Sequence, residues 1–346
     1  MWVTSSLATA LTPTSVALGN FDGIHRGHQQ VIQSIDPSRI APQAVSSPDY
    51  KWLPSIEEVS LTDGLLEDKQ PQAGQAASSG HSYATVVTFN PHPQEYFTGQ
   101  PRTLLTPLNE KHLLLDYLGV EQLVLLPFDR QLAYLSPEAF VQEILVQRLQ
   151  AEQISVGFDF RFGYRRAGTA AHLEAIAAMH DIAVNIVSPQ TCAGKQISSS
   201  AIRQCLQQGN LKLANQLLGR AYTLVGLVVP GQQLGQTIGF PTANLQLPIE
   251  KFLPRQGVYA VRVHSSSLPQ PQPGVMNLGY RPTVNGIDQT IEVHLLDWSG
   301  DLYGQRLTVC LETFLRPEQK FATLNALKAQ IEIDAAAART YLQQAI

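Results

Sequence analysis

The sequence predicts two domains, an N-terminal Rossmann-like α/β/α domain and a C-terminal antiparallel β-barrel or sandwich that ends in a helix. First, 346 residues exceed what one hydrophobic core usually serves. Second, strand-like and helix-like patterns alternate up to residue 187, as in a parallel sheet covered by helices. Third, short alternating runs separated by glycine and proline turns follow from residue 221. We therefore expect domains at 1–186 and 221–346, joined by a helical connection at 187–220.

The composition excludes several classes of protein. Hydrophobic residues make up 44% of the chain and charged residues 15%, as in globular proteins. The net charge is −4 without any block of lysine or arginine, which argues against a nucleic-acid partner but leaves room for a single nucleotide. No apolar run could cross a bilayer, and residues 1–15 lack a secretory pattern. We expect a cytoplasmic protein without membrane contacts, a monomer or weak homo-oligomer, whose three scattered cysteines stay reduced.

The elements of the first domain begin with an apolar strand at residues 16–18, then a turn and a helix. The pattern next predicts strands at 83–89, 122–126, 153–157 and 183–187, and helices at 108–118, 137–149 and 170–180. Ser136 is the expected N-cap of the helix at 137–149, with Pro137 as its first residue. Residues 36–82 are rich in Ser, Pro, Gln and Ala, so we interpret them as a mobile surface insertion rather than a functional lid.

The connection and second domain follow a different pattern. Helices are expected at 201–208, ended by Gly209 and Asn210, and at 211–218, ended by Gly219. The strand-like runs are LVGLVV, GVYAVRVH, QTIEVHLLDW and RLTVCLETFL. Leu324, Leu327 and Ile331 at helical spacing then predict a last helix at about 323–345.

A pair of histidines marks the first candidate site, in the segment GNFDGIHRGH directly after the first apolar strand. His25 and His28 are three residues apart, so at a helix start they project to one side. The free N–H groups of a helix start suit a polyphosphate, and Gly27 lets it approach the backbone. Gly19 and Gly23 permit the tight turn. Two alternatives remain: histidines that only pack, and a metal site, which usually needs a spacing of four and a third ligand.

A second candidate anion site is ISSSAIR, where hydroxyls precede a predicted helix and Arg203 lies one turn inside it. The alternative is an ordinary serine N-cap with a solvated arginine. In the second domain, Thr242 and Asn244 of GFPTAN share one face if the segment is extended, and their oxygens suit Mg²⁺. A plain turn at a strand end is the alternative.

Glu292 is the candidate base of the second domain. Strand alternation places it on the same face as His294 and opposite Val293, so that the acid could lie at a barrel mouth and accept a hydroxyl proton. A solvent-facing glutamate on an ordinary strand is the alternative.

Several segments together resemble one known family. The HxGH segment is similar to the adenylyl-transfer site of the nucleotidyltransferase superfamily, and TFNPHP, LLPFDRQLAYLSPEAFV, VGFDFRFGYRRAG and ISSSAIR follow in an order that resembles the FAD synthetase module of bacterial bifunctional riboflavin kinase/FAD synthetases. GFPTAN, PGVMNLGYRPT, IEVHLLDWSGDLYG and LRPEQKFATLNALKAQI resemble the flavokinase pattern. The resemblance implies a nucleotidyltransferase domain, a flavokinase barrel, and the conversion of riboflavin to FMN and of FMN to FAD with ATP and Mg²⁺.

The same resemblance implies roles for individual residues. His25, His28 and Glu292 would be catalytic, with Glu292 as the base, and Thr242 and Asn244 would contact Mg²⁺. The residues implied to bind ATP or its phosphates in adenylyl transfer are Gly19, Phe21, Asp22, Gly23, Gly27, Ser199, Ser200 and Arg203. The implied flavin and nucleotide neighbourhood comprises Asn90, His92, Asp159, Arg161, Gly239 and Pro241.

The chain departs from the family pattern at two positions, Ser200, where the family more often has threonine, and Gln236, where it often has arginine. Three alternatives stay open: an enzyme with one degenerate module, a flavin-binding protein without turnover, and an adenylyltransferase for another acceptor.

Overall fold

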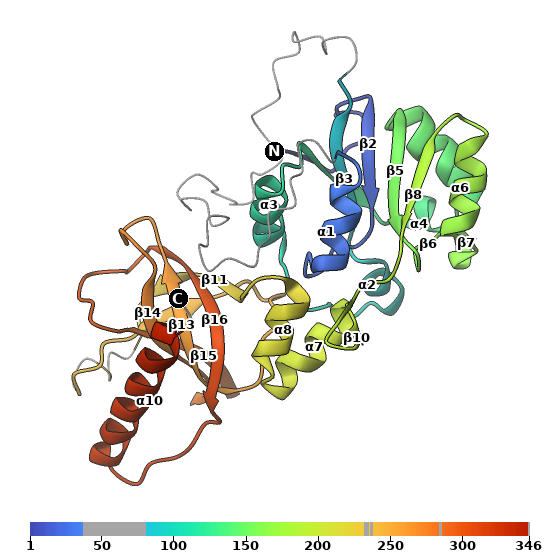
Figure 1. Cartoon of the computed structure of the whole chain (residues 1–346). Helices are drawn as coiled ribbons and strands as arrows, with labels where there is room; N and C mark the ends of the chain where they lie inside the picture. The colour runs from blue at the N-terminus through green and yellow to red at the C-terminus, as the bar shows by residue number, and fades with distance from the viewer. Residues whose placement is uncertain (37–80, 232–234, 236–237, 284–285, 345–346) are drawn as a thin grey trace. The chain divides into compact units, whose positions relative to one another are not determined.

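The computed structural model describes residues 1–36, 81–231, 235, 238–283 and 286–344 (Figure 1). Of these, the residues up to Ser198 form one compact unit and those from Ser199 form a second. The insertion expected at 36–82 lies almost wholly outside the described residues.

The first unit is built on a six-stranded sheet whose paired strands are all parallel, as the sequence predicted. Its order is β1 (Trp2–Thr4), β4 (Gln122–Pro127), β3 (Tyr83–Asn90), β2 (Thr14–Leu18), β5 (Ala151–Gly157) and β8 (Ala183–Val187). The chain leaves β2 toward β3 on one side and later returns to its other side with β5. Ligands of such sheets bind at the carboxyl ends of the strands where this reversal occurs.

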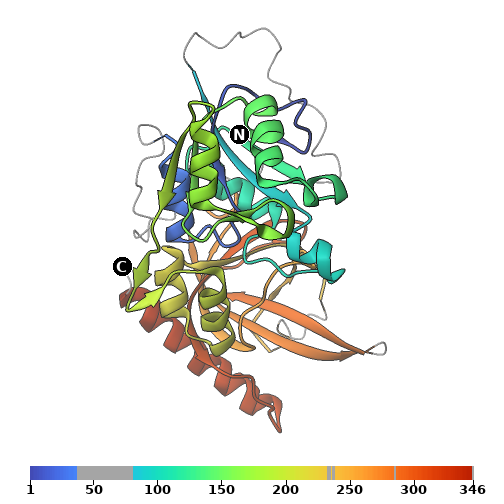
Figure 2. The same cartoon turned by 90° about the vertical axis from the view of Figure 1, so that its right-hand side faces the viewer.

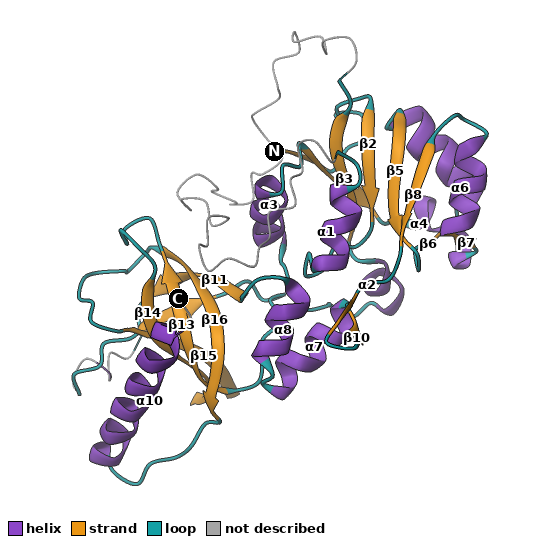
Figure 3. Cartoon of the chain, viewed as in Figure 1, coloured by secondary structure: helices purple, strands orange, loops and turns teal. Residues whose placement is uncertain are grey.

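Helices cover the sheet of the first unit (Figure 3). They are α1 (Arg26–Gln33), α2 (Pro93–Thr98), α3 (Leu108–Tyr117), α4 (Arg130–Ala133), α5 (Pro137–Ala139) with η2 (Phe140–Arg148), and α6 (Ala170–Ala178). The short elements are β6 (Arg161–Phe162), η3 (Tyr164–Arg166), β7 (Gly168–Thr169), β9 (Thr191–Cys192) and β10 (Lys195–Gln196). On one face, Leu145 of η2 and Leu173 of α6 pack with Val16, Val87 and Ile154 of the strands.

Two sequence expectations in this unit were incomplete. The helix predicted at 137–149 has its expected cap, because Ser136 Oγ accepts from Ala139 N at 3.1 Å, but most of it is a π-helix rather than an α-helix. Its end shows the wider spacing, since Leu149 N donates to Ile144 O at 3.0 Å. The edge strand β1 was not predicted, because three residues are too few to show a period.

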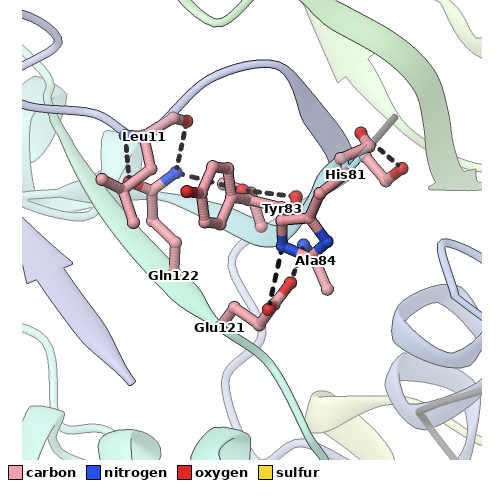
Figure 4. Close-up of polar contacts among 9 residues, drawn as sticks. Leu11, His81, Tyr83, Ala84, Glu121 and Gln122 are labelled. Atoms are coloured by element: carbon pink, nitrogen blue, oxygen red, sulfur yellow. Dashed lines mark hydrogen bonds and ion pairs between the residues drawn. The ribbon is translucent and has the colours of Figure 1, made fainter. Parts of the chain in front are cut away.

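Hydrogen bonds and an ion pair hold the amino ends of β3 and β4 together, at the ends of these strands opposite to their carboxyl ends (Figure 4). The Glu121 carboxylate accepts from Ala84 N at 2.9 Å and lies 3.2 Å from His81 Nε2. The Gln122 amide exchanges two hydrogen bonds with the backbone of Leu11, of 2.7 and 3.2 Å. These contacts fix where the chain enters β3 after the residues that are not described.

The second unit contains a closed six-stranded barrel with strand order β11-β12-β15-β14-β13-β16. The strands are β11 (Tyr222–Val229), β12 (Ala243–Gln246), β13 (Gly257–His264), β14 (Gln272–Thr283), β15 (Gly286–Leu295) and β16 (Arg306–Arg316). The structure therefore decides for a barrel over a sandwich. In Figure 2 the β14–β15 hairpin, in orange, extends away from the barrel. The final helix α10 (Leu324–Gln344) lies on the outer wall, where Ala335 and Ala338 pack against Ala260 and Val275.

Two helices, α7 (Ser199–Gln208) and α8 (Leu211–Leu218), open the second unit. Gly219 ends α8 at φ 78° in the left-handed conformation, as predicted. The helices are fastened to the barrel, since Arg255 N donates to Leu206 O at 2.9 Å and Asn215 Nδ2 donates to Leu311 O at 2.9 Å. Helix α7 begins two residues earlier than expected, so Ser199 and Ser200 lie inside its first turn rather than ahead of it.

Cys205 and Cys310 are buried and Cys192 is half-buried, and no disulfide joins these three residues. In the part of the chain that the structure describes, every helix is too short or too polar to cross a membrane.

Candidate functional site

In the first unit, the carboxyl ends of three adjacent strands bring together most of the residues implied in adenylyl transfer. β3 ends at Asn90, β2 leads into the loop from Gly19 to His25, and β5 leads into the segment with Asp159 and Arg161. Since β2 lies between β3 and β5, these segments meet at the point where the strand order reverses.

The loop after β2 has an unusual backbone. Phe21, Gly23 and Ile24 have φ values of 47°, 97° and 39°, of which only glycine adopts its value without strain. The Phe21 and Ile24 side chains are almost fully buried and anchor the loop. A Cβ on Gly19 would lie 3.2 Å from the Phe21 ring, so any larger residue there would press on this ring. Strain of this kind is typical of functional loops.

The two histidines lie together at the start of α1. His25 is the N-cap and its Nδ1 accepts from His28 N at 3.2 Å. The two rings stack with centroids 3.6 Å apart and planes 14° from parallel, and the Phe21 ring meets His28 edge-on at 5.3 Å. An imidazole that accepts at Nδ1 carries its proton on Nε2, so Nε2 is the donor nitrogen of His25. Gly27 lies against the His25 ring, where a Cβ would be 3.4 Å from it.

Asp22, implied as an ATP-binding residue, is 4% exposed. Its carboxylate accepts hydrogen bonds from the backbone of the segment before α3. Its Oδ1 accepts from Leu105 N at 2.7 Å and from Thr106 N at 3.4 Å. Gly23 N in turn donates to Thr106 Oγ1 at 2.8 Å. Asp22 therefore holds the loop in place. Lys111 of α3 also contacts the loop, since its Nζ donates to Asn20 O at 3.0 Å.

Asn90 and His92 lie at the carboxyl end of β3, where His92 is the N-cap of α2 and accepts from Gln94 N at 3.1 Å. An aromatic cluster adjoins them, which the sequence analysis missed. The Phe128 ring lies between those of Tyr96 at 5.4 Å, Phe97 at 5.7 Å and Phe89 at 5.7 Å. Phe97 is 69% exposed, so the cluster offers an aromatic surface to solvent. Its residues are far apart in sequence, and only TFNPHP followed by Tyr-Phe hints at them.

The segment after β5 carries Asp159 and Arg161, both exposed, on the way to the β6–β7 hairpin. Beyond them, the Tyr164 ring stacks on that of Tyr134 at 5.2 Å. Arg165 lies 5.2 Å over the Tyr164 ring. Arg165 has φ 54°, so this turn too has a left-handed residue that is not glycine.

Ser199, Ser200 and Arg203 belong to α7 of the second unit. The Arg203 guanidinium lies 4.6 Å over the ring of Phe252, a cation–π contact inside that unit. The arginine is therefore positioned by packing as well as by its place one turn into the helix.

The second unit brings Glu292 and Asn244 side by side. Asn244 of β12 is the cross-strand partner of Glu292 of β15, whose partner on the other side is Asn277 of β14. Cross-strand partners share a face of the sheet. The row Asn244–Glu292–Asn277 therefore places one carboxyl group between two amides. The sequence analysis missed Asn277, because only the strand register shows that it adjoins Glu292.

The strand register also shows which way the side chains of this row face. Asn277 shares its face of β14 with Val275, which packs against α10, whereas Met276 and Val293 on the opposite face are fully buried in the barrel. The row therefore faces outward from the barrel wall.

His294 fastens the GFPTAN segment next to this row. Its Nδ1 lies 2.8 Å from Pro241 O, and its ring meets that of Phe240 edge-on at 5.5 Å. Thr242 then leads into β12, with Ala243 buried between Thr242 and Asn244. Gly239, the first residue of this segment, has φ 88°. Gln236 lies outside the described residues.

Among the described residues, no three His, Cys, Asp or Glu side chains come together as a metal site. The metal alternative for the histidine pair thus gains no third ligand of these types there. Oxygen donors of threonine and asparagine, as near Glu292, are a different set, which fits Mg²⁺ together with phosphate and water.

Comparison with known proteins covers both units. A family model described as FAD synthetase matches residues 7–44 and 71–201, and one described as riboflavin kinase matches residues 218–342. The residues between 44 and 71 are not matched.

Three curated relatives are each described as a bifunctional riboflavin kinase/FMN adenylyltransferase. The protein of Escherichia coli strain K12 is 39% identical over 94% of this chain and 92% of its own length. The Haemophilus influenzae protein is 35% identical over 94% of each chain. The Bacillus subtilis protein is 34% identical over 92% of this chain and 89% of its own.

Among solved structures, a crystal structure described as a macrolide-efflux protein from Streptococcus pneumoniae is similar over 97% of this chain and 98% of that one. Its TM-score is 0.76 and its sequence identity 29%.

Proposed function

This chain belongs to the family of bifunctional riboflavin kinases/FMN adenylyltransferases, so it phosphorylates riboflavin to FMN and adenylylates FMN to FAD. We propose that each of the two reactions has its own site. The row Asn244–Glu292–Asn277 serves the kinase reaction, and the stacked histidines at the start of α1 serve adenylyl transfer. The predicted domains, 1–186 and 221–346 with a connection at 187–220, are the corresponding proposal for the organisation of the chain.

In the kinase reaction, Glu292 takes the proton of the ribityl 5′-hydroxyl while that oxygen attacks the γ-phosphorus of ATP and ADP leaves. The observation that supports this role is the carboxyl group between two amides in strand register. Asn244 and Asn277 can orient the carboxylate without neutralising it, because an amide donates hydrogen bonds but carries no charge. His294 holds Pro241, so that the segment with Thr242 keeps its place beside β15.

Mg²⁺ fits this site through the donors that the chain offers. Thr242 and Asn244 would hold it by a hydroxyl and an amide oxygen, and the remaining ligands would be phosphate oxygens and water. When bound, the ion offsets the negative charge of the phosphates. The chain's own residues then orient the hydroxyl and remove its proton.

In adenylyl transfer, an FMN phosphate oxygen attacks the α-phosphorus of ATP, the bond to the β-phosphate oxygen breaks, and pyrophosphate leaves. His25 and His28 donate to the phosphoryl oxygens as charge builds on them. Support comes from the His25 Nδ1 contact with His28 N, which makes Nε2 the donor nitrogen of His25, and from the stacking of the two rings at the start of α1. The N–H groups at the start of α1 add donors for the phosphates. Gly19, Phe21, Asp22 and Gly23 shape the loop that meets them.

The aromatic cluster of Tyr96, Phe97 and Phe128 fits the flavin. An isoalloxazine ring is flat and aromatic, so it can stack on the exposed Phe97 ring. Asn90 and His92 lie at the base of this cluster, with Asp159 and Arg161 on the loop of a nearby strand. Ser199, Ser200 and Arg203 remain a proposed phosphate contact of the same reaction.

Two variants test the assignment in one experiment, in which flavins are separated after incubation with ATP and either riboflavin or FMN. His28→Ala should lower FAD formation by about 100-fold, the scale of one lost transition-state donor, and leave FMN formation unchanged. Glu292→Gln should lower FMN formation by about 100-fold or more, because it removes a base, and leave FAD formation from added FMN unchanged.

Each variant is the folding control of the other, and Glu332→Gln on the exposed side of α10 is the matched control for Glu292→Gln. Equal loss of both activities in either variant would contradict the assignment. Wild-type protein that makes FMN without FAD would contradict the adenylyltransferase proposal. The compartment and oligomeric state remain predictions: cytoplasmic, and a monomer or weak homo-oligomer.

A further inference from the structure

Lys111 is a buried lysine that the proposed mechanism does not use. It lies in the first turn of α3 and is 8% exposed. Lysine is rarely buried to this extent, and the positive end of the helix dipole also disfavours a cation in a first turn. The side chain thus occupies a place that is unfavourable for its charge on two counts.

The hydrogen bond that Lys111 makes does not by itself require a cation. Its Nζ donates to Asn20 O at 3.0 Å, in the loop that leads to the stacked histidines. The same carbonyl accepts from Thr88 Oγ1 at 3.1 Å. One neutral donor therefore already serves this oxygen, and a second neutral donor could serve it as well.

The charged group that faces the ammonium from another element is Asp22, whose Oδ1 already accepts from two backbone N–H groups. On α3 itself Glu110 precedes Lys111, and His112 lies against Met1 and Asp116. Burial lowers the pKa of Lys111 to about 8, although the charge of Asp22 acts in the opposite sense. The ammonium is therefore still charged at pH 7, and Asp22 does not fully offset its burial.

We propose that Lys111 is a positioning residue for adenylyl transfer, whose buried charge holds the loop from Gly19 to Gly23 ready for the ATP phosphates. The inference depends on the proposed role of this loop and adds a residue to it. Bound triphosphate adds negative charge to that of Asp22 near this loop, so ATP binding and the charge of Lys111 strengthen each other. Lys111 thereby couples two segments, the loop after β2 and the first turn of α3.

The test compares Lys111→Gln, which keeps a donor but loses the charge, with Lys111→Arg, which keeps both, in steady-state assays of FAD formation from FMN. Lys111→Gln should lower kcat/KM for ATP by about tenfold or more, equivalent to about 1.4 kcal/mol, and Lys111→Arg should recover most of it. FMN formation should stay unchanged in both. Lys212→Gln, at an exposed position of α8, is the control for loss of a lysine.

The pH dependence separates this role from a purely structural one. In the wild type, kcat/KM for ATP should fall above pH 8, where the free protein loses this charge, and the fall in kcat should lie at higher pH, because bound ATP stabilises the ammonium. In Lys111→Arg the fall near pH 8 should disappear. If Lys111→Gln fails to fold in a thermal melt, the comparison of the wild type with Lys111→Arg decides alone.

Two results would overturn the proposal: a Lys111→Gln variant with wild-type kcat/KM, or the same fall near pH 8 in Lys111→Arg. These outcomes differ from failure of the proposed function, in which the wild type makes no FAD or His28→Ala forms it normally.

Discussion

His264 of β13 illustrates how one residue sets a pH dependence of stability. Burial lowers its pKa to about 4, and the nearby charge of Arg262 acts in the same direction. Between this value and the ordinary value of 6.5, the unfolded chain binds more protons than the folded one, so the free energy of unfolding rises with pH across that window. The difference corresponds to about 3 kcal/mol at its lower end. Above pH 6.5 this residue adds no pH dependence.

Urea denaturation from pH 4 to pH 7.5 measures this effect, and His264→Gln should make the curve flatter between pH 4 and 6.5. His180→Gln, in the first unit, is the control. An equally steep curve in His264→Gln would show that other groups cause the acid sensitivity.

At the residue scale, the sequence reveals a site where its residues are close in the chain. His25, His28 and the glycines around them form one segment, and its position at a helix start indicates that it binds phosphate. Asn277 and Phe128 could not be predicted as site residues, because a strand register and ring contacts between distant segments create their roles. Lys111 is similar, since nothing in its neighbouring residues shows that it is buried under a loop whose Asn20 lies 91 residues earlier.

At the element scale, α10 is held to the barrel by two ion pairs of different character. Asp334 is 5% exposed and accepts from Arg316 Nε at 2.9 Å and from Gln330 Nε2 at 3.0 Å. Asp297 is exposed and accepts from Arg339 at 2.9 and 3.1 Å, a contact that lowers the pKa of Asp297. Removing one partner of a buried pair leaves the other uncompensated, whereas exposed pairs contribute little.

Asp334→Ala should therefore lower the free energy of unfolding by about 3 kcal/mol, and Asp297→Ala should change it little. Chemical denaturation of both variants checks this, with fluorescence and circular dichroism as independent probes. A similar effect of the two substitutions would mean that apolar packing of Ala335, Ala338 and Leu342, not the buried pair, holds α10.

Elements with a long period or a clear cap were predicted well, such as α3 and α8. Several elements were not predicted, among them β1, β12 and β14, and the type of η2 was wrong. β1 is too short, β12 directly follows a proline-containing turn, and η2 has the composition of an α-helix but a wider turn. For η2, the predicted start was right, with Ser136 as N-cap and Pro137 as first residue. The hydrogen bonds between residues i and i+5 of a π-helix have no local sequence signal that separates it from an α-helix.

At the scale of the whole molecule, the attachment of α7 and α8 predicts where the chain can be divided. A fragment of residues 199–346 should unfold cooperatively and phosphorylate riboflavin. A fragment of residues 222–346 lacks the partners of Arg255 N, Leu311 O and Tyr222 N, together with the apolar cover of α8. Its melting temperature should be lower by about 5 °C or more, measured by calorimetry. Equal melting temperatures would show that the two helices do not stabilise the barrel.

The two fold classes could be predicted because each has its own sequence pattern. The α/β domain shows buried apolar strands with helices between them, and the β-barrel domain shows short strands of alternating polarity. The choice of a barrel over a sandwich could not, since closure depends on β11 meeting β16 and β12 meeting β15 across long separations. The same holds for the outer position of Glu292, because alternation shows which residues share a face but not whether that face is inside.

The location of Glu292 on the outer wall has a consequence for engineering. The side chains of Tyr259, Met276, Val293 and Leu311 face the buried interior of the barrel, and none of them is among the proposed site residues. Substitutions that improve packing there can raise thermal tolerance without the loss of activity that usually accompanies stabilisation near a catalytic centre.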